Sequence, residues 1–123
     1  MKKKILVVDD SEFVRNYHSY ILTHADFDVL TAVDGSDGLE KLYTHPCDVI
    51  LTDINMAHMD GYEFIRRVRA EPQYEDLPII IISTEGAKSD KMKGFEAGAN
   101  LYIVKPSEPA VMIENIRLVL GGQ

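Results

Sequence analysis

Five short segments of strand length, each made largely of apolar residues in succession, are spread along the whole chain. Strands that alternate apolar and polar residues have one face in water, whereas continuously apolar strands are covered on both faces. The segments therefore predict a parallel sheet that is buried between layers of helices. They comprise residues 5–8, 29–32, 49–51, 79–82 and 101–104.

The stretches between these segments show helical spacing of apolar residues, three or four positions apart. Asp60 followed by Glu63 has the form of a capping box, and Ser107 with Pro109 suits the first turn of the last helix. Strands and helices thus alternate throughout. The residues that share a helical face are Val14 with Tyr17 and Ile21, Leu39 with Leu42, Ile65 with Val68, Met92 with Phe95, and Ile113 with Ile116 and Leu120.

Alternating strands and helices joined by short links, with right-handed crossovers, build a doubly wound α/β fold. We expect a five-stranded parallel sheet in the order 2-1-3-4-5, of the flavodoxin-like type, with helices on both faces. In this order the first and third strands are neighbours at the topological switch point, where ligands bind at the carboxyl ends of strands. The length of 123 residues and the even composition predict one domain, residues 1–123.

Charge and apolar content exclude several classes of protein. The formal charge of −7 disfavours direct binding to nucleic acid, and the lysines at positions 2–4 are expected to be solvated. The apolar run after them is too short for a signal peptide or a membrane span, so we expect a cytoplasmic protein with no membrane association. The single cysteine, Cys47, cannot form an intrachain disulfide and is expected to pack in the fold.

Three carboxylates follow the two strands that meet at the predicted switch point. Asp9 and Asp10 come directly after the first strand, and Asp53 follows the third. Converging carboxylates repel one another unless a cation lies among them, and oxygen ligands favour Mg²⁺. Two adjacent acids alone would more often be a solvated turn. The third acid, at the end of a buried strand, favours a magnesium site.

A hydroxyl and an ammonium group are predicted at the same edge of the sheet. Ser83 ends the fourth strand and Lys105 follows the fifth. An anion formed at Asp53 would meet a cation, a hydroxyl donor and a metal, which are the groups that stabilise a transferring phosphoryl group. The four histidines are interpreted as surface or packing residues, and they are His18, His24, His45 and His58.

Four sequence motifs together resemble the receiver domain of the response regulators of two-component systems, and in particular the stand-alone CheY-like regulators. They are VVDD at the first strand, LTDINM at the third, IIST at the fourth and YIVKP at the fifth. Each motif alone is weak, but the combination is specific and covers essentially the whole chain. The resemblance implies a two-component phosphorelay protein with the same 2-1-3-4-5 sheet.

The resemblance also assigns roles to single residues. Asp53 would accept a phosphoryl group from a sensor histidine kinase, a phosphotransfer protein or a small phosphodonor. Ser83 and Lys105 would bind that group. The protein would not be an enzyme acting on other substrates, because it would catalyse only its own phosphorylation and dephosphorylation. The implied Mg²⁺ ligands are Asp10, Asp53, Asp9 through water and Asn55 through its backbone carbonyl.

In the family, phosphorylation changes a distant surface. Ser83 and Tyr102 match the hydroxyl and the aromatic residue of that switch, and the bond between Lys105 and Pro106 matches a cis peptide. The last two helices and the fifth strand would then bind a downstream effector protein. With no output domain expected after Gln123, the signal would pass by docking or by phosphorelay.

Several positions depart from the family pattern or tune it. Ala57 stands where the loop after the third strand usually has a proline, and Ser107 replaces the aromatic residue usual after Lys-Pro. Thr84 is bulkier than the alanine or glycine that usually follows the hydroxyl residue. Asn55 and Glu85, at positions that in the family help to set the rate of dephosphorylation, resemble the pair found in chemotaxis regulators whose phosphorylated state is short-lived. We therefore expect a phosphorylated state that lasts seconds to minutes, lengthened somewhat by Thr84.

Two other functions are compatible with this fold. A pseudo-receiver would bind partners without phosphorylation, but it usually lacks an acid or the lysine, and here all are present. An aspartyl-nucleophile phosphatase would need an aspartate where Asn55 stands, and a flavin protein would need a Ser/Thr/Gly loop where Asp9 and Asp10 stand. The cognate kinase, the target pathway and the choice between a monomer and a phosphorylation-dependent dimer are left open.

Overall fold

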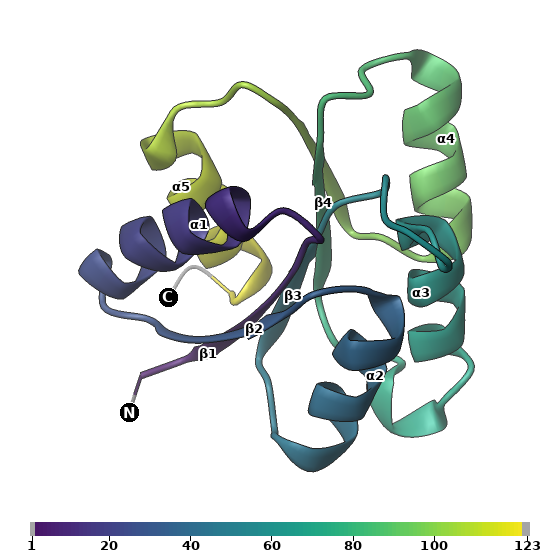
Figure 1. Cartoon of the computed structure of the whole chain (residues 1–123), viewed down its shortest axis with the longest axis horizontal. Coiled ribbons are helices and arrows are strands. Elements are labelled where there is room, and N and C mark those ends of the chain that lie inside the picture. Colours follow the sequence, from purple (N-terminus) through teal and green to yellow (C-terminus); the bar gives the residue numbers. More distant parts are fainter. Residues whose placement is uncertain (1, 122–123) are drawn as a thin grey trace.

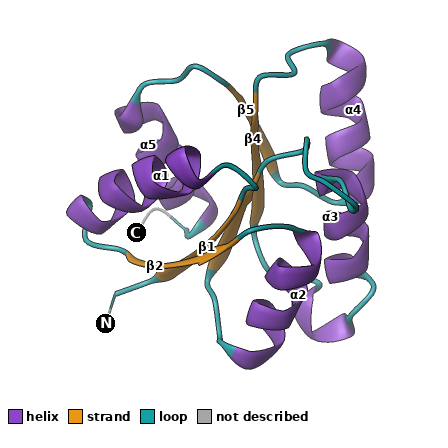
Figure 2. Cartoon of the chain, in the orientation of Figure 1, coloured by secondary structure: helices purple, strands orange, loops and turns teal. Residues whose placement is uncertain are grey.

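The central sheet has five parallel strands in the order β2-β1-β3-β4-β5, so the predicted topology is confirmed. The computed structural model describes residues 2–121. Figure 2 shows the twisted sheet running through the middle of the molecule between two groups of helices. The strands are β1 (Lys4–Val8), β2 (Asp28–Ala32), β3 (Val49–Thr52), β4 (Ile79–Ser83) and β5 (Leu101–Val104).

Two helices cover one face of the sheet and three cover the other. α1 and α5 lie together on the first face, and α2, α3 and α4 lie on the second (Figure 1). No helix within residues 2–121 has the length and apolarity needed to cross a membrane. The helices are α1 (Glu12–His24), α2 (Gly35–Thr44), α3 (Gly61–Arg69), α4 (Lys88–Ala97) and α5 (Pro109–Val119), with a 3₁₀ turn η1 (Pro72–Tyr74) after α3.

The register of the strands brings their carboxyl ends to one edge. Val8 of β1 lies opposite both Ala32 of β2 and Thr52 of β3, and Ser83 of β4 lies opposite Val104 of β5. The ladder continues one step beyond β3, where the amide of Asp53 donates to the carbonyl of Val8 at 3.0 Å. Residues that follow these strands must therefore lie near one another.

The sheet separates two apolar cores because successive strand residues point to opposite faces. Leu6, Ile50 and Ile81 belong to the core beneath α2, α3 and α4. Val7 and Leu51 belong to the core beneath α1 and α5. All five side chains are essentially inaccessible to solvent, which explains the continuous apolar runs in the sequence.

Local capping fixes where the helices begin. The Asp60 carboxylate accepts a hydrogen bond from the amide of Glu63 at 2.9 Å, as the capping-box pattern predicts. The side chain of Glu63 pairs with Arg66 and Arg67 instead of closing the box. The last helix begins with a proline, as expected, but its N-cap is Glu108 and not the preceding serine.

Helix α1 buries a different face from the one that its apolar residues suggest. Tyr17 is 46% exposed, whereas His18 is 4% exposed and Leu22 is fully buried. The buried residues of α1 are therefore His18 and Leu22, and of the predicted face Val14 and Ile21 are half-buried. The ring of Tyr17 stacks on that of Phe13 at the surface, with their centroids 6.4 Å apart.

Helix α4 turns its large apolar residues outward. Met92 and Phe95 are 52% and 47% exposed, and Gly94 and Ala97 are the buried residues. A Cβ atom at Gly94 would lie 2.7 Å from Cδ1 of Ile81 and 3.2 Å from Cδ2 of Tyr102. The absence of a side chain at Gly94 is what allows α4 to approach β4 and β5 closely.

A half-buried arginine, Arg69, connects the end of α3 to the turn that follows α4. Arg69 donates to the carbonyl of Gly98 at 3.0 Å, to the carbonyl of Tyr74 at 2.7 Å and to Oδ1 of Asn100 at 2.9 Å. The same Oδ1 accepts the amide of Ile79, at the start of β4. This set of bonds holds the C-terminal end of α4 to the sheet.

Candidate functional site

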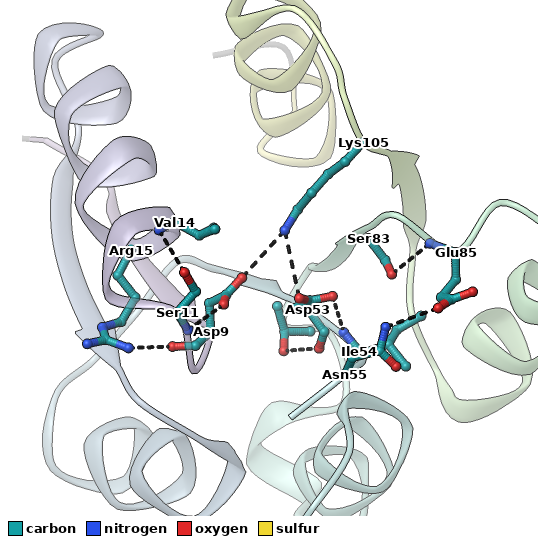
Figure 3. Close-up of polar contacts among 11 residues, drawn as sticks. Asp9, Ser11, Val14, Arg15, Asp53, Ile54, Asn55, Ser83, Glu85 and Lys105 are labelled. Carbon is teal, nitrogen blue, oxygen red and sulfur yellow. Dashed lines mark hydrogen bonds and ion pairs between the residues drawn. The ribbon is translucent and has the colours of Figure 1, made fainter. Parts of the chain in front are cut away.

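Two carboxylates and one ammonium group meet at the carboxyl edge of the sheet. The Nζ atom of Lys105 lies 3.6 Å from Oδ2 of Asp9 and 3.7 Å from Oδ2 of Asp53. Figure 3 shows the lysine reaching from the end of β5 across to the ends of β1 and β3. The predicted meeting of Asp9, Asp53 and Lys105 is confirmed, and this ion cluster is the centre of the candidate site.

Asp9 is almost completely buried, with only 2% of its surface exposed. Its Oδ1 atom accepts the amide of Ser11 at 2.9 Å. Its Oδ2 atom is buried and accepts no hydrogen bond from any residue of the described chain, 2–121. Burial raises the pKa of the Asp9 carboxyl, although the Ser11 amide and Lys105 partly counteract this. The site therefore holds a carboxylate oxygen that further positive charge would stabilise.

Asp10 lies next to this cluster and is exposed to solvent. Its negative charge contributes to the raised pKa of Asp9, and so does the charge of Asp53. Across the described residues, no three Asp, Glu, His or Cys side chains form a group that could hold a metal ion. Mg²⁺ commonly takes only one or two carboxylates and keeps several waters. The proximity of Asp9 and Asp53 fits such a site, and the ligand roles of Asp10 and Asn55 stay predictions.

The backbone around Asp53 is held in place by the start of α3. Oδ1 of Asp53 accepts the amide of Ile54 at 2.7 Å, and the carbonyl of Ile54 accepts the amide of Gly61 at 2.7 Å. A Cβ atom at Gly61 would collide with the carbonyl oxygen of Asp53. Sequence reasoning missed the role of Gly61, and the only signal for it was a glycine directly after the N-cap Asp60.

Glu85 connects three of the predicted site residues. Its amide donates to Oγ of the buried Ser83 at 3.1 Å, and its carbonyl accepts the hydroxyl of Tyr102 at 2.6 Å. Its carboxylate accepts the side-chain amide of Asn55 at 3.2 Å. Burial raises the pKa of Tyr102, so the phenol is protonated and able to donate. The structure thus places Ser83, Tyr102 and Asn55 around one residue that was predicted only to tune dephosphorylation.

The loops that border the site contain the positions that depart from the family pattern. The Lys105–Pro106 peptide bond is cis, as the resemblance implies. Ala57 is exposed, and the next residue, His58, has a positive φ of 68°. Ser107 and Thr84 both line a pocket of about 290 Å³ beside Lys105. Sequence alone did not predict this pocket.

His18 is a second residue that sequence reasoning did not place near the site. Burial, with a smaller contribution from the positive charge of Lys105, lowers the pKa of its imidazole from 6.5 to about 4. The ring is therefore neutral at pH 7. Its Nδ1 atom is buried and forms no hydrogen bond with the part of the chain that the structure describes. The interpretation of His18 as a packing residue fits its burial but not its unpaired nitrogen.

Comparison with known proteins agrees with this geometry. A family model described as the response regulator receiver domain matches residues 5–117. The chain belongs to the response regulator receiver family. Its role in two-component signalling follows from this membership, and receiver domains in general interact with histidine kinases and effectors.

Individual relatives are similar over nearly the whole chain. A chemotaxis protein CheY homolog of Campylobacter jejuni is 43% identical, with 96% of this chain and 92% of the relative covered. Chemotaxis protein CheY1 of Helicobacter pylori strain J99 is 41% identical, with 96% and 97% covered. The solved structure of Vibrio cholerae chemotaxis protein CheY4 matches with a TM-score of 0.92 at 37% identity, covering 97% of this chain and 99% of the other. The chain is thus a receiver of the CheY-like type.

Proposed function

We propose that this receiver is a phosphorylation switch in which Asp53 accepts a phosphoryl group in the presence of Mg²⁺. The observation that carries the proposal is the position of Lys105, whose ammonium group lies within 4 Å of both Asp9 and Asp53. The fully buried hydroxyl of Ser83 ends the neighbouring strand. A lysine, a hydroxyl and two carboxylates at one edge suit phosphoryl transfer better than hydrolysis of a separate substrate.

The transfer itself needs no catalytic base, because an ionised carboxylate is already a nucleophile. An oxygen of Asp53 attacks the phosphorus of a phosphohistidine in a donor protein, or that of a small phosphodonor such as acetyl phosphate. A bond forms between this oxygen and phosphorus, and the bond from phosphorus to the donor breaks. The product is an acyl phosphate on Asp53, and the donor leaves with the bonding electron pair.

The residues around Asp53 are suited to hold Mg²⁺. The Oδ2 atom of Asp9 supports this: it accepts no hydrogen bond within residues 2–121 and has the Lys105 ammonium 3.6 Å away, and a buried carboxylate oxygen of this kind is stabilised by a further nearby cation. Asp10, Asp53 and the carbonyl of Asn55 would hold the ion directly, and Asp9 would hold it through water. The bound ion would supply positive charge to the phosphoryl oxygens during transfer.

Loss of the phosphoryl group would be governed by the residues at the mouth of the site. Asn55 and the Glu85 carboxylate are hydrogen-bonded to each other across this mouth. Thr84 is exposed beside them. An attacking water must pass these side chains, so we expect a lifetime of seconds to minutes. A decay of the phosphorylated protein that takes many hours would contradict this expectation.

The switch would run through the backbone of Glu85. Ser83 and Tyr102 bind the amide and the carbonyl of this one residue. If Ser83 turns its hydroxyl to a phosphoryl group on Asp53, the amide of Glu85 loses its acceptor and the loop must rearrange, together with Tyr102. A change from mostly resting to mostly active requires about 5 kcal/mol of differential stabilisation, which charged contacts to a phosphoryl group can supply.

The surface formed by α4, β5 and α5 is the proposed docking site for an effector protein. Met92 and Phe95 of α4 are exposed there, as are Val111 and Leu118 of α5. Large apolar side chains at the surface often mark a protein interface. Affinity capture with beryllofluoride-activated protein should retain an effector that the resting protein does not retain.

The direct test of the proposed chemistry is mass spectrometry of the intact protein after incubation with acetyl phosphate and Mg²⁺. We expect one phosphate adduct on the unmodified chain and none on Asp53→Asn. Chelation of the metal should also abolish the adduct. The matched control is Asp26→Asn, which removes an equivalent charge from an exposed turn far from the site and should leave the adduct unchanged. An adduct that persists in Asp53→Asn would overturn the proposal.

A further inference from the structure

Helix α1 exposes a row of aromatic rings to solvent. Phe13 is 77% exposed, Tyr17 46% and Tyr20 66%, and His24 in the last turn is also exposed. With 3.6 residues per turn, the four positions fall within a strip about 60° wide along the helix. Single exposed apolar side chains are common, but a continuous group of them marks an interaction surface. We call these four residues the aromatic seam.

The spacing of the aromatic seam is typical of a surface that pairs with another helix. Its members are separated by four, three and four residues. This is the alternation of the a and d positions in a coiled coil, whose side chains interlock with those of a facing helix. The seam therefore fits a helix better than it fits an extended peptide or a small molecule.

The aromatic seam is symmetric about its own centre. The rings of Phe13 and Tyr17 are stacked, with centroids 6.4 Å apart, and those of Tyr20 and His24 form a second pair with centroids 4.2 Å apart. If two α1 helices run antiparallel about a twofold axis, Tyr17 of one copy faces Tyr20 of the other, and Phe13 faces His24. Each ring pair then meets the other ring pair. A second copy of the chain thus presents the complementary surface, as a twofold interface requires.

The charge of α1 also favours a second copy as the occupant. The whole chain has a formal charge of −7, so two copies repel each other overall. Helix α1 contains one acidic residue, Glu12, and one basic residue, Arg15, and is formally neutral. The exposed residues along one edge of the seam, Asn16 and Thr23, carry no charge. Antiparallel packing also sets the two helix dipoles in opposition. Two copies can therefore approach along α1 without repulsion.

The area of the aromatic seam indicates how strong this contact can be. From their exposed fractions, the three largest rings would bury about 400 Å² per copy, or about 800 Å² in the pair, at roughly 200 Å² for a whole aromatic side chain. Stable interfaces bury about 1,200 to 2,000 Å² in total, and smaller ones are transient. The rings are already stacked in pairs, which reduces the entropy lost on association. We therefore expect a weak, reversible contact.

We propose that the aromatic seam of α1 is a self-association surface, on which a second copy of this chain packs its own α1 antiparallel about a twofold axis. The dissociation constant is on the order of 100 µM. The seam contains none of the residues proposed to rearrange on phosphorylation, so the dimer forms in the resting protein. It involves neither α4 nor β5, and it is therefore distinct from the surface proposed to bind an effector.

The test is sedimentation equilibrium of the full chain at concentrations from about 10 to 500 µM, which bracket the expected dissociation constant. The average mass should rise from that of a monomer toward that of a dimer over this range. The same curve should be obtained with and without beryllofluoride, because the seam does not depend on the state of Asp53.

Two substitutions test the antiparallel geometry. Tyr17→Glu and Tyr20→Lys each place a charge against an aromatic ring of the other copy, and each should weaken self-association at least about tenfold. An equimolar mixture of the two variants should associate at least about fivefold more strongly than either variant alone, because the new carboxylate then lies opposite the new ammonium group. The control is Phe95→Glu, which makes the same charge change at an exposed ring of α4 on the other face of the sheet and should leave the dissociation constant unchanged.

Three results would overturn the proposal. The first is a chain that stays monomeric up to the highest concentration. The second is a dimer that persists in Tyr17→Glu or Tyr20→Lys, because the contact would then use another surface. The third is a mixture of the two variants that associates no better than each alone. Urea denaturation confirms that each variant is folded. Phosphorylation of Asp53 enters none of these measurements, so failure here would leave the proposed function intact.

Discussion

Helices α1 and α4 flank the same site from opposite faces of the sheet, yet they are anchored in different ways. α1 inserts the side chains of His18 and Leu22 into the core. It is also held at its start, where Ser11 caps it and Arg15 donates to the carbonyl of Asp9. α4 buries only Gly94 and Ala97. Side chains that interlock resist displacement, whereas small residues present a smooth surface. The comparison indicates that α1 is a fixed wall of the site and that α4 is the element free to shift.

The largest effect should come from removing the main anchor of α1. Leu22 is fully buried in the core beneath α1 and α5, and Leu22→Ala should lower the free energy of unfolding by about 3 kcal/mol. Urea denaturation at pH 7 measures this change. A loss below about 1 kcal/mol would break the comparison, because α1 would then be no better anchored than α4.

The second largest effect concerns the other anchor of α1. The pKa of His18 is about 4 in the folded protein, whereas an unperturbed imidazole has a pKa of 6.5. The unfolded chain therefore takes up a proton that the folded chain does not, and stability falls with falling pH in this range. Between about pH 7 and pH 5 the loss should be about 2 kcal/mol.

The measurement for His18 is the free energy of unfolding as a function of pH in the unmodified chain and in His18→Leu. The variant should lose this part of the pH dependence, and the contributions of the other histidines and carboxyls should cancel in the difference. Parallel curves for the two proteins would show that folding does not lower the pKa of His18, and so that it is not a buried neutral anchor.

A smaller effect is expected where α4 touches the sheet. Gly94→Val would place new atoms against Ile81 and Tyr102, and overpacking of this kind should cost about 1.5 kcal/mol. Lys93→Val, at an exposed position one residue earlier, is the control for helix propensity. We also expect the amide and ring signals of Tyr102 to shift only in Gly94→Val. Equal effects of the two substitutions would mean that the contact between α4 and the sheet is looser than the structure indicates.

The smallest effect should follow truncation of the exposed apolar face of α4. Phe95→Ala should change the free energy of unfolding by less than about 0.5 kcal/mol, because the ring is 47% exposed. The same substitution should weaken capture of the effector by beryllofluoride-activated protein. A stability loss comparable to that of Leu22→Ala would contradict the assignment of this face to a partner.

The same two helices mark the limit of what could be predicted from the sequence. The strands and their order were predicted correctly, because runs such as residues 79–82 have no polar side to expose. The ends of these strands then determine that Asp9, Asp53 and Lys105 meet. The rotation of each helix about its axis is less constrained. Tyr17 and Phe95 can lie against a core or face a partner, and nothing in local sequence distinguishes the two.

Contacts made by small or polar residues were harder to predict than those made by apolar ones. Gly61 and Gly94 matter through the close approach of two backbones, which depends on packing between distant segments. The burial of His18 depends on what surrounds α1, including the space left by Ser107. Glu85 joins its partners mainly through backbone atoms, which every residue possesses and which therefore leave no trace in the sequence.

The bonds of Arg69 determine how α4 can move. Its guanidinium holds Gly98, at the C-terminal end of the helix, to Tyr74 and Asn100. The opposite end follows the loop that contains Glu85, whose contacts are those of the site. With one end clamped, α4 can act as a lever whose pivot is Gly98. A small displacement of the Glu85 loop would then swing the N-terminal half of the helix, and with it Met92, more than the half that carries Ala97.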